Sequence, residues 1–436
     1  MSSPSNNALG IYVSIPFCRS KCTYCNFASG VYPASAHGRY IERVIEELHQ
    51  TPDFAEKMGV ELPRRVDSIY LGGGTPSLLA PELIDRLFAA LRSAFRVLPA
   101  AEITVECAPA QLSDETLAAF VRAGVNRASL GVQSFVDAEL RVSGRLHTRA
   151  SALETIGQLR RFGIHNLNLD LIAGLAGQTE ASWEESLATL LEANPAHASV
   201  YMLEVDEDSR LGRELLAGGE RYHAGEVPED GAITAMYERA IERLAAAGLM
   251  QYEISNFARP GFESRHNLRY WQRRPYLGLG LDASSMLHVL PGKSENCAQG
   301  DLFAPADEAA RKRADQQEKS RQEEDRYVLR IATTAELQAY LDGSEPAETA
   351  WLSPDRQHEE AWFLGLRRNE GVKLASIRRE FGVQRLEHAR AAIEKLQPGG
   401  LIDFDGKTVH LTPKGRLFSN EVFQEFLGTA EDEPAE

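Results

Sequence analysis

The chain has 436 residues, of which 43% are hydrophobic and 25% charged, as is typical of soluble globular proteins with a large core. The net charge of −16 argues against a nucleic-acid surface as the main function, and no apolar run approaches the roughly 20 residues of a membrane span. The start of the chain lacks the basic and apolar regions of a secretory signal, and the cysteines are few and clustered. We therefore expect a cytoplasmic protein, with residues 1–9 disordered.

The cysteines indicate a metal site near the N-terminus. Residues 11–15 predict a strand, and the loop that leaves it carries Cys18, Cys22 and Cys25 in a C-x3-C-x2-C spacing. Thiolates suit soft metals and iron–sulfur clusters, whereas a structural zinc site is normally closed by four ligands. No second pair of ligands follows, so three cysteines would leave one iron of a [4Fe–4S] cluster open to a small molecule. A zinc or disulfide loop is the alternative.

Strand and helix patterns alternate along the first half of the chain. Strands are expected at residues 11–15, 66–71, 102–106, 127–132, 167–172 and 198–203. Helices are expected at residues 36–58, 81–95, 112–123, 150–162, 183–192 and 231–247. This alternation predicts a parallel sheet with right-handed crossovers.

Polar residues lie in or just after the C-terminal halves of these strands. They are the three cysteines, the glycines of GGGTP, Glu106, Gln133, Asp170 and Glu204. Barrel enzymes carry their chemistry on that face. One such residue is usually a cap or turn, but a repeated series predicts an α/β fold, an open partial (β/α)6 TIM-like barrel over residues 10–250.

The rest of the chain divides into an extension and a small C-terminal unit. Residues 251–345 contain an aromatic and arginine-rich block, a Gly-rich apolar run, a charged segment at 293–325 and a helical pattern at 326–341. We interpret the charged segment as a solvated helix or flexible insertion.

Residues 352–427 combine helical patterns with two short strands joined by an Asp-Gly turn. Helices are expected at 358–368, 374–381, 385–396 and 413–426, and strands at 401–404 and 408–411. This pattern predicts an α+β winged-helix-like domain. Because the domain lacks clustered basic residues, we interpret it as a lid or docking domain, followed by a disordered tail at 428–436.

The cysteine spacing, with an aromatic residue before the third cysteine, resembles the radical S-adenosylmethionine (SAM) superfamily. From residue 11 to residue 427 the chain resembles the oxygen-independent coproporphyrinogen oxidases and their HemW-type relatives. The resemblance rests on IPFCRSKCTYCNF, GGGTP, ITVE, NRASLGVQSF, GRLH, LNLDLIAGL, YEISNFA, HNLRYW and LTPKGRLFSNEVFQEFL. It implies a [4Fe–4S] cluster whose open iron binds SAM, and an electron donor for that cluster.

The resemblance also implies which residues hold the cofactors. Cys18, Cys22 and Cys25 would bind the cluster. SAM would be bound by Tyr12, Tyr24, Gly73, Gly74, Thr75, Glu106, Gln133, Arg145 and Asp170. Carboxylates suit an ammonium group and ribose hydroxyls, and a guanidinium suits a carboxylate.

The chain departs from the oxidases at several positions. The oxidases carry a fourth cysteine two residues after the third, where this chain has Phe27, as in the HemW-type relatives. Ala108, Ala176 and Ser284 replace an asparagine, a proline and a histidine of the family. These changes favour a haem chaperone that binds haem and passes it to haemoproteins. The alternatives are an enzyme that decarboxylates coproporphyrinogen III to protoporphyrinogen IX, and a zinc-stabilised interaction protein.

The haem ligand is expected in the HNLRYW block, which matches a motif proposed as the haem site of HemW-type proteins. His266 would supply the axial imidazole, with Asn267 fixing its tautomer and Tyr270 and Trp271 forming flat walls. The propionates would meet the neighbouring cations Arg265, Arg269, Arg273 and Arg274. The alternative is an ordinary hydrogen-bonded histidine, in which case His147 is the next candidate.

Overall fold

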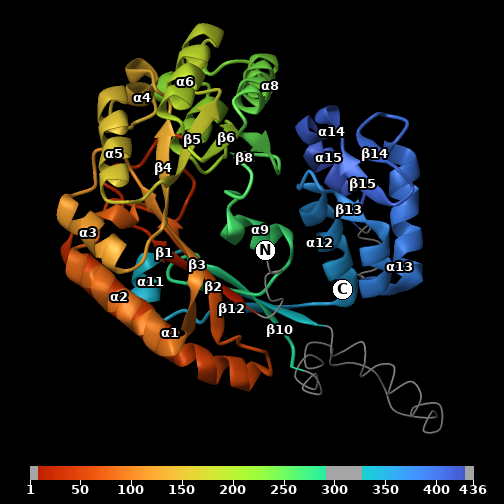
Figure 1. Ribbon diagram of the computed structural model, residues 1–436, viewed down its shortest axis with the longest axis horizontal. Coiled ribbons are helices and arrows are strands. Elements are labelled where there is room, and N and C mark those ends of the chain that lie inside the picture. Colours follow the sequence, from red (N-terminus) through yellow and green to blue (C-terminus); the bar gives the residue numbers. More distant parts are fainter. Residues whose placement is uncertain (1–7, 291–326, 428–436) are drawn as a thin grey trace.

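The computed structural model describes residues 8–290 and 327–427 (Figure 1). The predicted charged insertion and C-terminal tail lie outside this part of the chain. The prediction that residues 1–9 are disordered is wrong for its last two residues, because Ala8 is buried and Leu9 begins the first strand. Within the described ranges, every helix is too short or too polar to cross a membrane.

Six parallel strands form the centre of the main sheet in chain order. They are β1 (Leu9–Ile15), β2 (Arg65–Gly73), β3 (Arg96–Cys107), β4 (Arg127–Gln133), β5 (Asn166–Ala173) and β6 (His197–Met202). Each pairs in parallel with the next. This confirms the predicted α/β barrel. Strand β3 starts earlier than the predicted residue 102, because Arg96 pairs with Arg65 of β2.

Helices follow the strands and cover the outer face of the sheet (Figure 1). The predicted ones are α1 (Ser35–Met58), α2 (Pro81–Ala94), α3 (Asp114–Arg122), α5 (Arg149–Arg161), α6 (Glu180–Ala193) and α8 (Asp230–Ala246). Ser113 caps α3 by accepting a hydrogen bond from Thr116 N. Two short helices, α4 (Asp137–Val142) and α7 (Arg210–Leu216), were not predicted.

The barrel stays open because other strands extend both edges of the sheet. Beyond β6 lie the antiparallel strands β8 (Asn256–Ala258) and β7 (Met250–Gln251). Beyond β1 lie β9 (Tyr276–Leu279), β10 (Ser284–His288), β11 (Val328–Ala332) and β12 (Glu348–Leu352). The helix predicted at residues 326–341 is therefore wrong over its first part. Its VLRIA segment pairs with β10 and β12, and only α11 (Leu337–Asp342) is helical.

Helix α9 (Arg265–Trp271) lies at the end of the barrel opposite the cysteine loop. Its Arg269 is buried and forms an ion pair with Asp67 near the start of β2. The same guanidinium donates to the carbonyls of Ala8, 2.8 Å away, and Pro275, 2.9 Å away. One side chain therefore joins α9 to the starts of β1, β2 and β9.

The C-terminal unit has a core of its own around Trp362, Phe381 and Phe426. Its elements are α12 (Pro354–Leu366), β13 (Val372–Lys373), α13 (Leu374–Leu396), β14 (Ile402–Phe404), β15 (Thr408–Leu411), α14 (Pro413–Leu417) and α15 (Ser419–Gln424). Gly382, with φ of 87°, breaks α13 between its two predicted helices. The antiparallel order β13-β15-β14 and the flanking helices agree with a winged-helix-like domain.

We predict that the Asp67 carboxylate strongly stabilises the end of the barrel opposite the cysteine loop. Asp67→Ala leaves the buried guanidinium of Arg269 without a counter-charge, so we expect a loss of about 3–5 kcal/mol in the free energy of unfolding by urea. Asp85→Ala is the control, because its ion pair with Arg122 is exposed and should contribute less than about 1 kcal/mol. Equal losses in the two variants would contradict this role.

Candidate functional site

The cysteine loop is fastened to the C-terminal ends of β1 and β2 by backbone hydrogen bonds. Cys18 N donates to Gly30 O at 2.8 Å, and Gly30 N donates to Pro16 O at 2.9 Å, which closes the base of the loop. Gly74 N donates to Ile15 O at 2.9 Å. A Cβ at Gly74 would lie 2.7 Å from the same carbonyl oxygen, so only glycine permits this approach. The GGGTP turn therefore forms one wall beside the loop.

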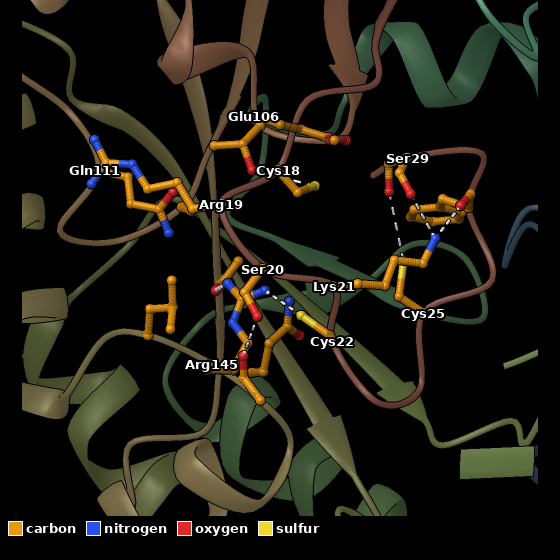
Figure 2. A pocket seen from close by; sticks show the side chains of 18 of the residues that line it. Cys18, Arg19, Ser20, Lys21, Cys22, Cys25, Ser29, Glu106, Gln111 and Arg145 are labelled. Atoms are coloured by element: carbon orange, nitrogen blue, oxygen red, sulfur yellow. Dashed lines mark hydrogen bonds between the residues drawn. The ribbon is translucent and has the colours of Figure 1, made fainter. Parts of the chain in front are cut away.

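The three thiols are free and each has a polar neighbour (Figure 2). Arg145 Nη1 lies 3.3 Å from Cys22 Sγ, Thr75 Oγ1 lies 3.8 Å from Cys18 Sγ, and Ser29 Oγ lies 4.0 Å from Cys25 Sγ. The Arg145 guanidinium places a positive charge beside Cys22. These contacts suit an anionic cluster.

The three thiols lie on one loop and line one pocket. Among residues 8–290 and 327–427, no three His, Cys, Asp or Glu side chains are grouped closely enough to hold a single metal ion. A [4Fe–4S] cube places each cysteine on a different iron, so its ligands surround a volume and need not meet at a point. The donor set therefore fits the predicted cluster.

The thiols open into a pocket with about 850 Å³ of empty space, part of it continuous with solvent. Most of the predicted SAM residues line it: Tyr24, Gly73, Gly74, Thr75, Glu106, Gln133 and Arg145. Two do not. Tyr12 lies beside Tyr70 with ring centroids 6.1 Å apart, and Asp170 accepts a hydrogen bond from Ser129, which does line the pocket. Both therefore lie one layer behind the lining.

Glu106 is the acidic group at the glycine wall. Its Oε1 accepts from Tyr70 Oη at 2.8 Å and its Oε2 from Gly73 N at 3.2 Å. Burial raises the pKa of this carboxyl to about 7. A carboxylate keeps further acceptor capacity beyond two hydrogen bonds, so Glu106 can still receive an ammonium group.

Several polar groups around the pocket lack a partner in the described structure. Tyr24 Oη and Arg145 Nε are buried without a hydrogen bond, although Arg145 Nη2 donates to Gly131 O. Gln133 takes the left-handed conformation with φ of 70°, which is strained for a residue with a side chain. Orphaned polar atoms and a strained residue at one pocket indicate a site built for a polar ligand, as the SAM prediction requires.

Other lining residues were not predicted. They include Lys21, Ser29, Gln111, Ser129 and Gly131. The period of two along β4 places Ser129 and Gly131 on the face of Gln133, so this part was accessible from the sequence. Lys21 was not, because its contribution is to the fold of the loop: its Nζ donates to the carbonyls of Phe27 and Ser29.

His266 is buried beneath this pocket, with both ring nitrogens engaged. Nδ1 lies 3.0 Å from Ser68 Oγ and Nε2 lies 2.8 Å from Tyr270 Oη. Burial lowers its pKa to about 3, so the imidazole is neutral. Its tautomer is set by these two hydroxyls; Asn267 instead donates its backbone N–H to the capping Ser264. Haem ligation by His266 stays a prediction, and it would require the Tyr270 contact to break.

The arginines near His266 are also engaged. Arg269 and Arg274 pair with Asp67, Arg273 pairs with Glu380, and Arg265 donates to two backbone carbonyls. The second candidate ligand, His147, is buried with Nε2 3.1 Å from Val132 O. In this conformation both ring nitrogens of His266 are engaged, whereas the contact of His147 is through Nε2.

The cluster assignment predicts a sharp difference among the cysteines. Replacing Cys18, Cys22 or Cys25 with alanine should lower the iron and sulfide content of anaerobically reconstituted protein from about four of each per chain to near zero. Cys107→Ala is the matched control, because this thiol is buried at the end of β3 and lines the same pocket. Purified protein that contains zinc but neither iron nor sulfide would refute the assignment.

Glu106 predicts a pH dependence of SAM binding. A ligand ammonium binds the ionised carboxylate, and burial raises the pKa of that group to about 7. SAM affinity should therefore fall as the pH is lowered, by about tenfold between roughly pH 8 and pH 6. Calorimetric titration of the cluster-loaded protein measures this, and Glu106→Gln should flatten the profile. A flat wild-type profile would exclude a carboxylate–ammonium contact at Glu106.

Known families and structures share these features. Residues 12–190 match the radical SAM superfamily and residues 352–418 the HemN C-terminal domain. The structure of coproporphyrinogen III oxidase (HemN) from Escherichia coli is similar with a TM-score of 0.75 and 23% identity, covering 96% of this chain and 90% of that one. The fold is therefore shared with that enzyme.

Two relatives are more similar in sequence. The chain is 35% identical over 276 residues to the heme chaperone HemW of Lactococcus lactis, covering 63% of this chain and 69% of the relative. It is 32% identical over 421 residues to the heme chaperone HemW of Bacillus subtilis, covering 96% of this chain and 98% of the relative. The chain belongs to the HemW family of the radical SAM superfamily, whose cofactors are a [4Fe–4S] cluster and SAM.

Proposed function

We propose that this protein binds haem and delivers it to haem-requiring proteins. The similarity to a heme chaperone along almost the whole chain carries the proposal. Phe27 supports it: where the oxidases have a fourth cysteine, this side chain is 63% exposed and lines the cluster pocket. An exposed aromatic side chain at the mouth of a site suits contact with a flat ligand or a partner.

The cofactor residues follow from the pocket. Cys18, Cys22 and Cys25 hold the cluster, and the glycine wall with Glu106 receives the amino group of SAM. Gln133, Arg145 and Tyr24 complete the pocket, with Tyr12 and Asp170 supporting it from behind. When reduced, such a cluster supplies the electron that cleaves SAM, so an electron-donor protein is a further proposed partner. Thiols that must stay reduced suit the cytoplasm.

The oxidase alternative is less well supported. The shared fold with HemN does not carry its activity, because one fold hosts many functions. Ala108 lines the cluster pocket at a position where the oxidases have an amide side chain, so a polar contact to a substrate or cofactor is missing. His266 remains the sequence-predicted haem ligand, and its test is joined to that of the second pocket below.

A transfer assay separates the two functions. Protein reconstituted anaerobically with cluster, SAM and haem should release haem to an apo-haemoprotein, seen as the acceptor's absorption spectrum. The same preparation given a strong reductant and coproporphyrinogen III should form no protoporphyrinogen IX, because Phe27 and Ala108 replace family residues. Multiple turnovers of decarboxylation, or no haem binding at all, would overturn the proposal.

A further inference from the structure

A second pocket lies between the barrel and the C-terminal unit. It encloses about 1280 Å³ of empty space, part of it open to solvent. One wall is the end of β6, with Tyr201, Met202 and Leu203, and the other is the α14–α15 region, with Leu417. Figure 1 shows α14 and α15 on the side of the C-terminal unit that faces β6 and β8. Tyr24 lines this pocket and the cluster pocket alike, so the two are neighbours.

Two arginines of the C-terminal unit line this pocket. Arg367 follows α12, and Arg416 belongs to α14. Arg367 Nε is buried without a hydrogen bond, and its one nearby carboxylate oxygen, Glu253 Oε2, is 4.0 Å away. Within the described part of the chain, Arg416 donates one side-chain hydrogen bond, from Nη1 to Gln251 Oε1 at 3.2 Å, and burial lowers its pKa. Both guanidinium groups therefore have donors to spare.

The position of Arg367 is set by two of the sequence motifs. Its guanidinium lies 4.5 Å from the centre of the Trp271 ring, the last residue of HNLRYW. Glu253 belongs to YEISNFA, is fully buried, and also accepts from the backbone N–H of Ser255 at 3.0 Å. The aromatic face and the buried carboxylate fix the place of the Arg367 guanidinium at the pocket. Trp271 therefore acts here by orienting Arg367.

The chemistry of the lining indicates the ligand. Aliphatic and aromatic side chains line the pocket together with the polar residues Ser255, Ser419 and Asn420, and Tyr201 is large and 42% exposed. Glu204 and Glu421 also line the pocket, but both are exposed residues, whereas the two arginines are partly buried. The volume open to a water-sized molecule is about 480 Å³, within the roughly 300–1,000 Å³ that is typical of ligand pockets. Apolar and aromatic side chains beside two arginines in one pocket fit a flat apolar body that carries two carboxylates.

We infer that the pocket between β6 and α14–α15 is the tetrapyrrole site, with the two propionate groups bound by Arg367 and Arg416. This inference rests on the proposed haem function and adds the location and the recognition chemistry. It places the macrocycle next to the cluster pocket and away from the His266 imidazole, whose nitrogens are both engaged.

The test compares charge on the protein with charge on the ligand. Protoporphyrin IX and its dimethyl ester are titrated into full-length, cluster-loaded protein by fluorescence. Arg367→Gln and Arg416→Gln should each weaken protoporphyrin IX binding by about 10-fold or more, as expected for a lost charge-assisted contact. The ester should bind weakly to wild type and no more weakly to either variant. Arg416→Lys, which keeps the cation, should lose less than Arg416→Gln.

Matched controls separate folding from recognition. Arg368→Gln changes the neighbouring arginine, which pairs with Glu370 and does not line the pocket, so its affinity should equal that of wild type. Iron content and thermal melting should be unchanged in all variants used. If wild type binds protoporphyrin IX and both glutamine variants bind it equally well, the pocket assignment is wrong while haem binding stands. The same variants are titrated with haem by absorbance: if only His266→Ala abolishes haem binding, the ligand belongs at α9. If wild type binds neither protoporphyrin IX nor haem, the proposed function fails.

Discussion

The buried ion pair between Arg269 and Asp67 holds together the parts of the molecule that carry function. It fixes α9 against the starts of β1, β2 and β9. From there His266 meets Ser68 and lies 5.3 Å, centre to centre, from the ring of Tyr70, whose hydroxyl orients Glu106 at the cluster pocket. In the other direction Trp271 orients Arg367. Helix α9, which carries HNLRYW, thus supports both pockets from the end of the barrel opposite the cysteine loop.

Patterns that depend on local chemistry were predicted correctly. The six strands follow from runs of apolar residues, and the cysteine loop and glycine turn follow from spacing, because each needs only its own segment and the rule that barrel sites lie at strand ends. The first part of residues 326–341 was misassigned because VLRIA forms a strand by pairing with β10 and β12. Neither strand is adjacent to it in the sequence. Tertiary pairing decided that element.

The haem prediction shows what a motif alone leaves undetermined. HNLRYW has the residue types of a haem site, but in the fold these side chains contact other protein groups. The imidazole of His266 contacts two hydroxyls, and Arg269 pairs with the carboxylate of Asp67. The two arginines of the second pocket, Arg367 and Arg416, come from another domain and lie far apart in the chain. No spacing rule brings them together, because their proximity depends on how the C-terminal unit packs on β6–β8.

Two neighbouring pockets that share Tyr24 give a direct account of how a radical SAM barrel can serve haem delivery. Tyr24 lines both the pocket of the cysteine thiols and the cavity between the barrel and the C-terminal unit. The most direct measurement is the crystal structure of the cluster-loaded protein with cobalt protoporphyrin IX, located by anomalous scattering. The account predicts cobalt between β6 and α14, with the propionates at Arg367 and Arg416. Cobalt bonded to Nε2 of His266 would contradict it.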